Sequence, residues 1–530
     1  MFNKAKKSVI FGLAFCSFAV SNCIVAQEST SKNLRNKVHE IKESLSGLSD
    51  QHLEITENEM AFSPFTLTLE DAIEHAVREN LSFQNNFDAL EISSRSYNSA
   101  KAGLYDPSMQ FGYTKRNNSS PPTISVPFDT SSKSDSYSVE YGQQLKNGIS
   151  SSLTYSTAFS KAVRSGIVTE ENKSGLVVSL SKPVNGHSDS FLQRRNSLAK
   201  LSIDQKKSYY SYLHQYQKLV FKVIKAYLDV VKDKRGIEVV ESVLKYQQEL
   251  LSLTQIKYKL GVATKLDVLR VEVQVAQQEE SIISSENNYK NSLESLLNIL
   301  NYQSSSQDVS IDYNSDYQQK EYDVEALLKT AMDLRYDLKI EKLTKEQKAL
   351  DLRLRERLLK NKINLSTSLQ KHGNGVDYSA ANKLDNKTWS IGLSYDMALG
   401  NREKREALMI QRVHSRTQER VLQDLKNGIR LDVKNTVRSI QANQKRIEVL
   451  KKNLQRANEN LRLAKLSYEK GIKSSIEVLD AQDDLLSVNN NYVNSLLALK
   501  TLEFDLELKV GSLHIPASVK LNTQKWVQAK

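Results

Sequence analysis

Two carboxylates, Glu477 and Asp480, stand three residues apart shortly after Gly471, near the end of a long charged tract. A spacing of three places both side chains on one face of a helix. Such a pair could act as a general acid and base, attract cations around an opening, or simply hydrate a helix surface. The choice among these depends on the elements that hold the pair.

Motifs that would support a catalytic role for the pair are missing from the sequence. We find no HExxH, GxSxG, GxxxxGK[ST] or GxGxxG pattern. The eight histidines are scattered without the spacing of metal ligands. The sequence therefore predicts neither an enzyme nor a metal or cofactor site.

The first 26 residues have the pattern of a secretory signal peptide, with lysines ahead of a short apolar run. Cleavage after Ala26 would remove both cysteines, Cys16 and Cys23, and would leave a mature chain without disulfides or thiolate ligands. The alternative is a lipoprotein anchored through Cys23, although Asn22 is a poor neighbour for a lipidated cysteine. We expect export through a cleaved signal peptide.

Charge and hydropathy exclude two further classes of protein. No later stretch approaches the roughly 18 consecutive apolar residues of a membrane-spanning helix, so a helical membrane protein is excluded. The formal net charge is +12, and it falls to +9 when the three lysines of the signal segment are removed. Acidic residues are interspersed throughout, as on a solvated helical surface, so we expect no nucleic-acid partner.

The prolines divide the chain into regions of different structure. None of the seven prolines lies between 184 and 515, and that region is rich in Leu, Lys, Gln, Glu and Ala. Such composition predicts very long helices. A helix over residues 402–470 would be about 100 Å long at 1.5 Å per residue, too long for the interior of a compact domain.

Alternating apolar and polar residues predict strands in two places, about 107–182 and about 362–399. In the last strand, Trp389, Ile391 and Leu393 alternate with serines and glycine, and Trp389 is a candidate interface aromatic. A loop containing His372 and Gly373 is expected before it. The first region is longer and has an additional hairpin around Gly148. Either this hairpin adds strands to the barrel or it lies outside the bilayer. We favour the second alternative, with two membrane strands in each half.

The same order of elements occurs twice, at an offset of 210 residues. Tyr258 matches Tyr468, and Gly261 matches Gly471 at this offset. Apolar residues follow a 3-4 spacing ahead of both glycines, which is typical of coiled coils. Each half therefore predicts a long helical hairpin that turns at its glycine.

These observations divide the chain into six parts. They are a signal peptide, 1–26; an N-terminal extension of uncertain order, 27–66; a first repeat, 67–301, with its helical hairpin over about 187–301; a linker, 302–323; a second repeat, 324–511, with its hairpin over about 402–511; and a C-terminal tail, 512–530.

The predicted strands are too few to close a barrel within one chain. Strands with one apolar and one small polar face occur in soluble sandwiches and in outer-membrane barrels with a wet lumen. Open sheet edges do not occur in lipid, because each unsatisfied backbone group costs several kcal/mol there. Membrane strands of this chain would therefore need copies from other subunits, and a trimer would supply at least twelve.

The two turn segments carry a resemblance to a known family. They read YKLGVATKLDVL over residues 258–269 and YEKGIKSSIEVLDA over residues 468–481. Together with the duplicated order of helix, strands and long hairpin, they resemble the TolC family of outer-membrane channel-tunnel proteins. The opening helix from Thr68 to Pro107 is also similar, and the resemblance covers about residues 67–511.

The resemblance implies an α+β membrane protein built from a duplicated unit of long coiled-coil hairpins plus strands. Three chains would share one outer-membrane β-barrel and one periplasmic α-helical barrel. The implied function is a passive exit duct of a tripartite efflux pump or a type I secretion system in a Gram-negative outer membrane. Its implied partners are a periplasmic adaptor protein and an inner-membrane RND or ABC transporter.

The resemblance also implies roles for residues of the turns. Asp267, Tyr468 and Lys473 match a latch that holds the periplasmic entrance closed, although the family pattern has Arg where Lys473 stands. Glu477 and Asp480 match an acidic ring around the entrance, with Glu477 replacing the Asp of the pattern. The remaining matches are the adaptor-docking turns, Gly261, Val262, Gly471 and Ile472.

The sequence also leaves a second function open, an exported coiled-coil structural or adhesin-like protein without a pore. It does not identify a transported substrate, since a passive duct takes its specificity from the transporter behind it.

Overall fold

A computed structural model describes residues 65–121, 130–164, 167–184, 188–302, 309–311 and 319–513. The chain divides into two units, Met1–Ser63 and Pro64–Lys530, and every described residue lies in the second. The predicted signal peptide, nearly all of the N-terminal extension and most of the C-terminal tail lie outside the described residues.

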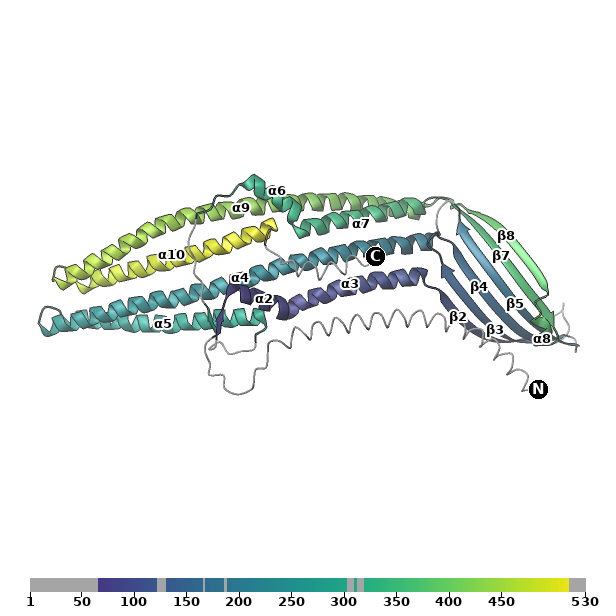
Figure 1. Cartoon of the computed structure of the whole chain (residues 1–530), viewed down its shortest axis with the longest axis horizontal. Coiled ribbons are helices and arrows are strands. Elements are labelled where there is room, and N and C mark those ends of the chain that lie inside the picture. The colour runs from purple at the N-terminus through teal and green to yellow at the C-terminus, as the bar shows by residue number, and fades with distance from the viewer. Residues whose placement is uncertain are drawn as a thin grey trace, which may run out of the picture. The chain divides into compact units, whose positions relative to one another are not determined.

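The helical elements occur in the same order in both halves of the chain (Figure 1). Two short helices come first, then strands, then a long helical hairpin. The first half has α2 (Leu69–Glu79), α3 (Leu81–Tyr105), α4 (Asp189–Lys259) and α5 (Lys265–Leu300). The second half has α6 (Val324–Leu334), α7 (Tyr336–Leu358), α9 (Arg402–Glu469) and α10 (Ser475–Val510).

Local sequence explains where these helices begin and end. Asn80 separates α2 from α3, and its side chain accepts a hydrogen bond from the Phe83 amide at the start of α3. Helix α3 ends at Tyr105, shortly before Pro107, because a proline cannot continue the hydrogen-bond ladder. No proline interrupts α4 or α9, which run for 71 and 68 residues. No helix among the described residues is both long enough and apolar enough to cross a membrane.

Six strands form one antiparallel sheet at the end of the helices away from the hairpin turns (Figure 1). Its order is β2-β3-β4-β5-β7-β8. The strands are β2 (Ser108–Ser120), β3 (Thr130–Gln144), β4 (Ser150–Arg164), β5 (Ile167–Pro183), β7 (Lys362–Gly375) and β8 (Asn386–Asp396).

The expectation of two strands in each half is wrong. The first half contributes four strands, and the hairpin that turns at Gly148 is formed by β3 and β4 in the body of the sheet. Strand β3 pairs with β4 over its whole length and with β2 from Thr130 to Gly142. The additional hairpin therefore widens the sheet instead of standing apart from it.

Strand β7 is also longer than expected, because His372 and Gly373 belong to the strand and not to a loop. The short helix α8 (Tyr378–Ala381) packs against this end of β7. A side chain at Gly373 would place its Cβ 2.1 Å from the Ala381 carbonyl oxygen. Glycine at position 373 therefore lets α8 pack closely against β7.

The two faces of the sheet differ in polarity along every strand. One row across all six strands is apolar and large, and consists of Met109, Tyr141, Leu153, Val178, Leu369 and Trp389. The adjacent row on the opposite face is small and polar, and consists of Ser108, Gly142, Ser152, Ser179, Ser368 and Ser390. In the single chain the apolar face is uncovered, and Trp389 is 69% exposed.

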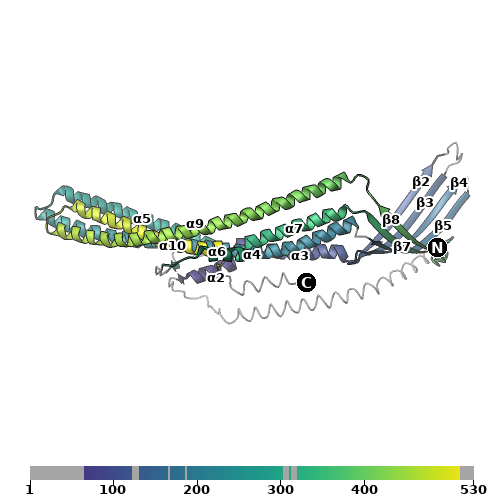
Figure 2. The same cartoon turned by 90° about the horizontal axis from the view of Figure 1, so that it is seen from above.

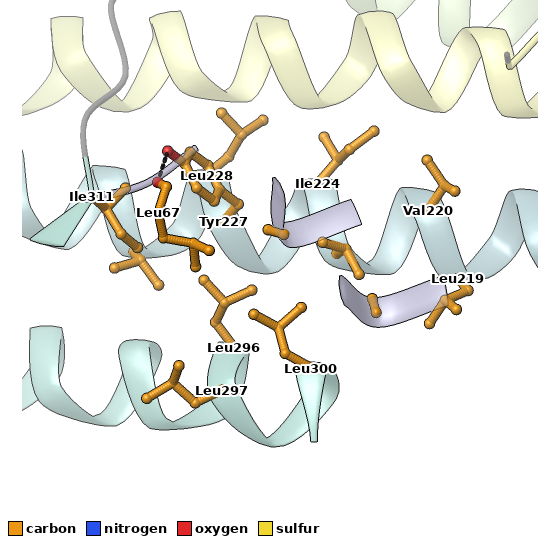
Figure 3. Packing of buried hydrophobic residues seen from close by; sticks show 14 of the residues in the cluster. Leu67, Leu219, Val220, Ile224, Tyr227, Leu228, Leu296, Leu297, Leu300 and Ile311 are labelled. Atoms are coloured by element: carbon orange, nitrogen blue, oxygen red, sulfur yellow. Dashed lines mark hydrogen bonds between the residues drawn. The ribbon is translucent and has the colours of Figure 1, made fainter. Parts of the chain in front are cut away.

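A hydrophobic core joins the first strand of the described chain to the first hairpin. Strand β1 (Phe65–Leu67) pairs in parallel with β6 (Val309–Ile311). Their side chains Leu67 and Ile311 pack beside α4 and α5 (Figure 3). The Tyr227 hydroxyl donates a 3.0 Å hydrogen bond to the Leu67 carbonyl within this core. This contact holds β1 against the middle of α4.

The two hairpins lie side by side, as both views show (Figures 1 and 2). Helix α4 packs against its own partner α5 and also against α10 of the second hairpin. A third apolar cluster near the turns includes Leu250, Leu461, Tyr468 and Leu479. The expected fold class, duplicated helical hairpins plus strands, is confirmed.

Candidate functional site

Both hairpin turns have the same backbone structure. Gly261 and Gly471 adopt left-handed φ angles of 74° and 77°, which glycine accommodates without the penalty that other residues incur. The amide of each glycine donates to the carbonyl three residues earlier, and the next amide donates to the carbonyl five residues earlier. This pair of bonds is the Schellman motif that ends helices. The duplicated glycines therefore mark two equivalent helix ends.

The residues that follow these glycines expose large apolar side chains at the turns. Val262 is 74% exposed and Ile472 is 75% exposed. Exposed apolar side chains that cluster in this way are typical of protein contact surfaces. The structure thus places all four predicted docking residues at the two turns.

The first turn ends in a capping box between Thr264 and Asp267. The Asp267 carboxylate accepts hydrogen bonds from the Thr264 hydroxyl at 2.6 Å and from the Thr264 amide at 2.9 Å. The Asp267 amide donates back to the Thr264 hydroxyl. These hydrogen bonds, the hydroxyl bond first, lower the pKa of Asp267 below its usual value. The carboxylate is therefore charged at neutral pH and is already engaged with its own helix.

The second turn has the same capping pattern in sequence, Ser474 and Glu477, but does not use it. The Ser474 side chain makes no capping hydrogen bond at the start of α10. Glu477 instead pairs with Lys473 at 3.2 Å. The first turn has Ala263 at the position of Lys473, so nothing there competes for the capping carboxylate.

Tyr468 is buried between the hairpins, in contrast to its counterpart in the repeat. It is 5% exposed, whereas Tyr258 is 46% exposed. The Tyr468 hydroxyl shares a 2.8 Å hydrogen bond with the Thr254 hydroxyl of α4. The Lys257 ammonium lies 4.1 Å from the centre of the Tyr468 ring and donates to the Tyr468 carbonyl. Burial, as the main cause, raises the pKa of Tyr468.

The three predicted latch residues therefore have separate partners in this chain. Asp267 is bonded to Thr264, Tyr468 to Thr254, and Lys473 to Glu477. No hydrogen bond or ion pair joins Asp267, Tyr468 and Lys473 to one another among the described residues. Thr254 and Lys257 are the partners that the sequence did not indicate, because a threonine and a lysine on a long helix carry no distinctive spacing.

The acidic pair lies on the first turns of α10, where both side chains are exposed. The pKa of Asp483 is raised, mainly by burial and further by the negative charges of Asp480 and Asp484. Asp480 therefore lies close to a second acidic pair. The spacing of three between Asp480 and Asp483 was the available signal for a larger acidic group.

A groove of about 530 Å³ lies between α5 and α10 beside this acidic group. Its lining includes the apolar side chains of Leu269, Val273 and Leu479 and the charged side chains of Arg270 and Asp480. No group of His, Cys, Asp and Glu in the described part of the chain could hold a metal ion.

Comparison with known proteins adds a family and a fold. The sequence pattern of the outer membrane efflux protein family matches residues 188–302 and 362–512. No curated protein matches the sequence closely enough to be counted.

Solved structures resemble the chain over most of their length. The outer membrane channel CmeC of Campylobacter jejuni has a TM-score of 0.63 at 13% identity, over 90% of this chain and 98% of CmeC. The outer membrane protein VceC of Vibrio cholerae has a TM-score of 0.60 at 15% identity, over 84% of this chain and 96% of VceC. MtrE of Neisseria gonorrhoeae, crystallised in an open state, has a TM-score of 0.60 at 16% identity, over 84% of this chain and 88% of MtrE. At these identities the likeness shows a shared fold.

Proposed function

The chain belongs to the outer membrane efflux protein family and serves as an exit duct in the outer membrane of a Gram-negative bacterium, and we propose that it does so as a homotrimer. The observation that carries the trimer is the six-stranded sheet, which is apolar on one face, polar on the other and open at β2 and β8. Three copies would give eighteen strands if β8 of each copy paired with β2 of the next. Closure removes the open edges that lipid does not tolerate.

The orientation of the strands is compatible with this closure. Neighbouring strands of the sheet are antiparallel throughout, so β2 and β8 run in opposite directions. A β8–β2 junction between copies would therefore continue the antiparallel pattern. The apolar rows would face lipid, and the serine and glycine rows would line a wet lumen.

The direct test of the duct is ion conductance of the purified protein in planar bilayers, combined with heat-modifiable migration on denaturing gels. We expect stable trimers that conduct. A protein that stays monomeric and does not conduct would support the alternative of a coiled-coil protein without a pore, which the family match does not favour.

The exposed turns support a second proposal, that adaptor proteins dock at Gly261, Val262, Gly471 and Ile472. Val262 and Ile472 offer apolar contact area, and the α5–α10 groove continues it with Leu269 and Leu479. A periplasmic adaptor bound there would link the duct to an inner-membrane RND or ABC transporter. The duct itself is passive, and the proposal includes no catalytic step, cofactor or metal.

We propose that Asp267, Tyr468 and Lys473 close the entrance through contacts between copies or in a second state. Forming them would require Asp267 to leave Thr264 and Lys473 to leave Glu477. Both existing contacts are exposed. The Lys473–Glu477 ion pair contributes about 0–1 kcal/mol, and the Thr264 cap contributes about 1 kcal/mol, so the exchange costs little.

Two substitutions separate the latch from helix capping. Asp267→Asn keeps an oxygen that can accept from Thr264 but removes the charge, and it should raise the leak conductance of the closed duct several-fold. Thr264→Ala removes the capping hydroxyl, at a cost of about 1 kcal/mol, but keeps the charge and should leave the leak near the wild-type level. A similar leak in both variants would assign the effect to capping and contradict the latch.

The acidic ring predicts cation block at the entrance. Three copies of Glu477 and Asp480 around a narrow opening would concentrate divalent cations there. Lys473 neutralises part of the Glu477 charge, whereas Asp480 lies beside Asp483. We therefore expect Asp480→Ala to weaken block by Mg²⁺ more than Glu477→Ala does, and the double variant to require about tenfold more Mg²⁺.

The matched control for the acidic ring removes two exposed carboxylates from α5, Glu279→Ala with Glu280→Ala. Mg²⁺ should block the conductance of this control variant at the same concentration as that of the wild type. Block that is unchanged in the Glu477 and Asp480 variants would refute the ring.

A further inference from the structure

A polar cavity lies where the base of the sheet meets the helices. Its volume is about 620 Å³, and it is lined by the start of α4, the end of α7 and the adjacent ends of several strands. A second cavity of about 340 Å³ shares Lys360, Lys362 and Asp396 with it and adds Lys404. Neither the acidic entrance nor the docking turns involve this region.

The lining of the larger cavity is positively charged. Its cations are Arg195, Arg357, Lys360 and Lys362, and we call these four residues the basic collar. Its acids are Asp189 and Asp396. Asp189 is already paired with Lys362 at 2.7 Å and with Lys404 at 3.5 Å. The cavity therefore keeps an excess of positive charge.

Two members of the basic collar are available to a ligand. Arg357 and Lys360 are exposed, and their side chains form no hydrogen bond or ion pair with any residue that the structure describes. Cations near a helix C-terminus also stabilise the helix, by about 0.3–1 kcal/mol. Arg355 lies in the same last turn of α7 and does not line the cavity. A cation that only stabilises the helix end can therefore point away from the cavity, and stabilisation alone does not explain why Arg357 lines it.

Most of the strand residues that line the cavity come from the polar face of the sheet, and Ile363 comes from the apolar face. Ser150 is paired with Ser181, and Asn364 with Ser394, and all four line the cavity. Leu365 and Leu393, which are paired one position away, belong to the opposite apolar face. The cavity therefore opens on the side that would face the lumen of the duct and not the lipid.

We propose that the basic collar binds phosphate or carboxylate groups of solutes that pass through the duct. This inference rests on the proposed trimeric duct, in which three collars would surround the lumen where barrel and helices meet. Guanidinium and ammonium groups are the usual ligands of such anions, and rings of Arg and Lys line anion-selective pores. The acidic entrance and the basic collar would then act on solutes of opposite charge at the two ends of the helices.

The test compares the collar variant, Arg357→Gln with Lys360→Gln, with a control, Arg353→Gln with Arg355→Gln. The control removes the same charge from the last turns of α7, outside the cavity, whereas Lys360 follows the end of that helix. Both proteins and the wild type are first checked for trimer migration. Reversal potentials are then measured across planar bilayers of neutral lipid in a KCl gradient, without and with inorganic phosphate. The collar variant should lose at least about twofold in its anion-to-cation permeability ratio, and phosphate should reduce the conductance of wild type and control more than that of the collar variant.

Three results would overturn the proposal. Equal permeability ratios and phosphate responses in wild type and collar variant would contradict the collar while leaving the duct intact. A difference that appears only in bilayers containing phosphatidylglycerol would assign the cavity to lipid headgroups instead of solutes. A wild-type protein that carries no current would contradict the duct as well as the collar.

Discussion

Arginine in place of Ile391 is expected to prevent assembly of the trimer, whereas arginine at the adjacent Ser390 is expected to leave the trimer intact. Ile391 lies on the apolar face of β8, opposite Thr367, and is largely exposed in the single chain. In the proposed barrel this face meets lipid. A charged side chain near the middle of the bilayer costs about 2–4 kcal/mol, and this cost would apply to each of the three copies in the trimer.

Ser390 is the matched control because it lies one residue away on the polar face. It pairs with Ser368, and their hydroxyls are 2.8 Å apart. An arginine there would project into a wet lumen at the loss of one hydrogen bond, about 0.5–1.5 kcal/mol. Trimer yield and melting temperature in detergent and in outer membranes measure the difference. Equal loss at both positions would contradict the assignment of the two faces.

Removing the ring of Tyr468 is expected to open the hairpin turns locally. The ring is almost fully buried between α4 and α9, with Thr254 and Lys257 against it. Truncation of a buried aromatic to alanine typically costs about 3–5 kcal/mol. Tyr468→Ala should therefore speed amide hydrogen exchange in α4 and α9 near the turns. Tyr468→Phe, which loses only the bond to Thr254, should have an effect of about 1 kcal/mol.

Tyr258→Ala provides the control from within the chain. Tyr258 occupies the equivalent position of the repeat but is nearly half exposed. Its truncation should therefore change exchange rates little in detergent-solubilised protein. Similar effects of the two alanine substitutions would mean that the position in the repeat, and not the contact of Tyr468 with α4, determines the role of these tyrosines.

Local sequence signals predicted the elements of the turns well. The duplicated glycines predicted both hairpin turns, because a left-handed helix end strongly favours glycine and no proline interrupts the helices around it. The alternation around Trp389 and Ile391 predicted the two faces of β8 for a similar reason, since side chains alternate in every strand. These features depend only on neighbouring residues.

Other features depend on contacts that the sequence does not contain. Tyr258 and Tyr468 are equivalent in the repeat, yet only Tyr468 is buried, because its side chain packs against Thr254 and Lys257 of α4 in the other hairpin. Glu477 pairs with Lys473 and makes no capping contact with Ser474, whereas the equivalent Asp267 caps its helix, and the repeat alone does not indicate this difference. The number of strands was also misjudged, since nothing within β3 or β4 states whether their hairpin joins the sheet or stands outside it.

The central claim is that three copies close one barrel through β8 and β2, and single-particle electron microscopy of the protein in lipid nanodiscs tests it most directly. We expect threefold particles in which β8 of each copy pairs with β2 of the next, with eighteen strands around a continuous lumen. Particles in which the sheet of one chain stays open, or pairs with anything other than a second copy of this chain, would contradict the account.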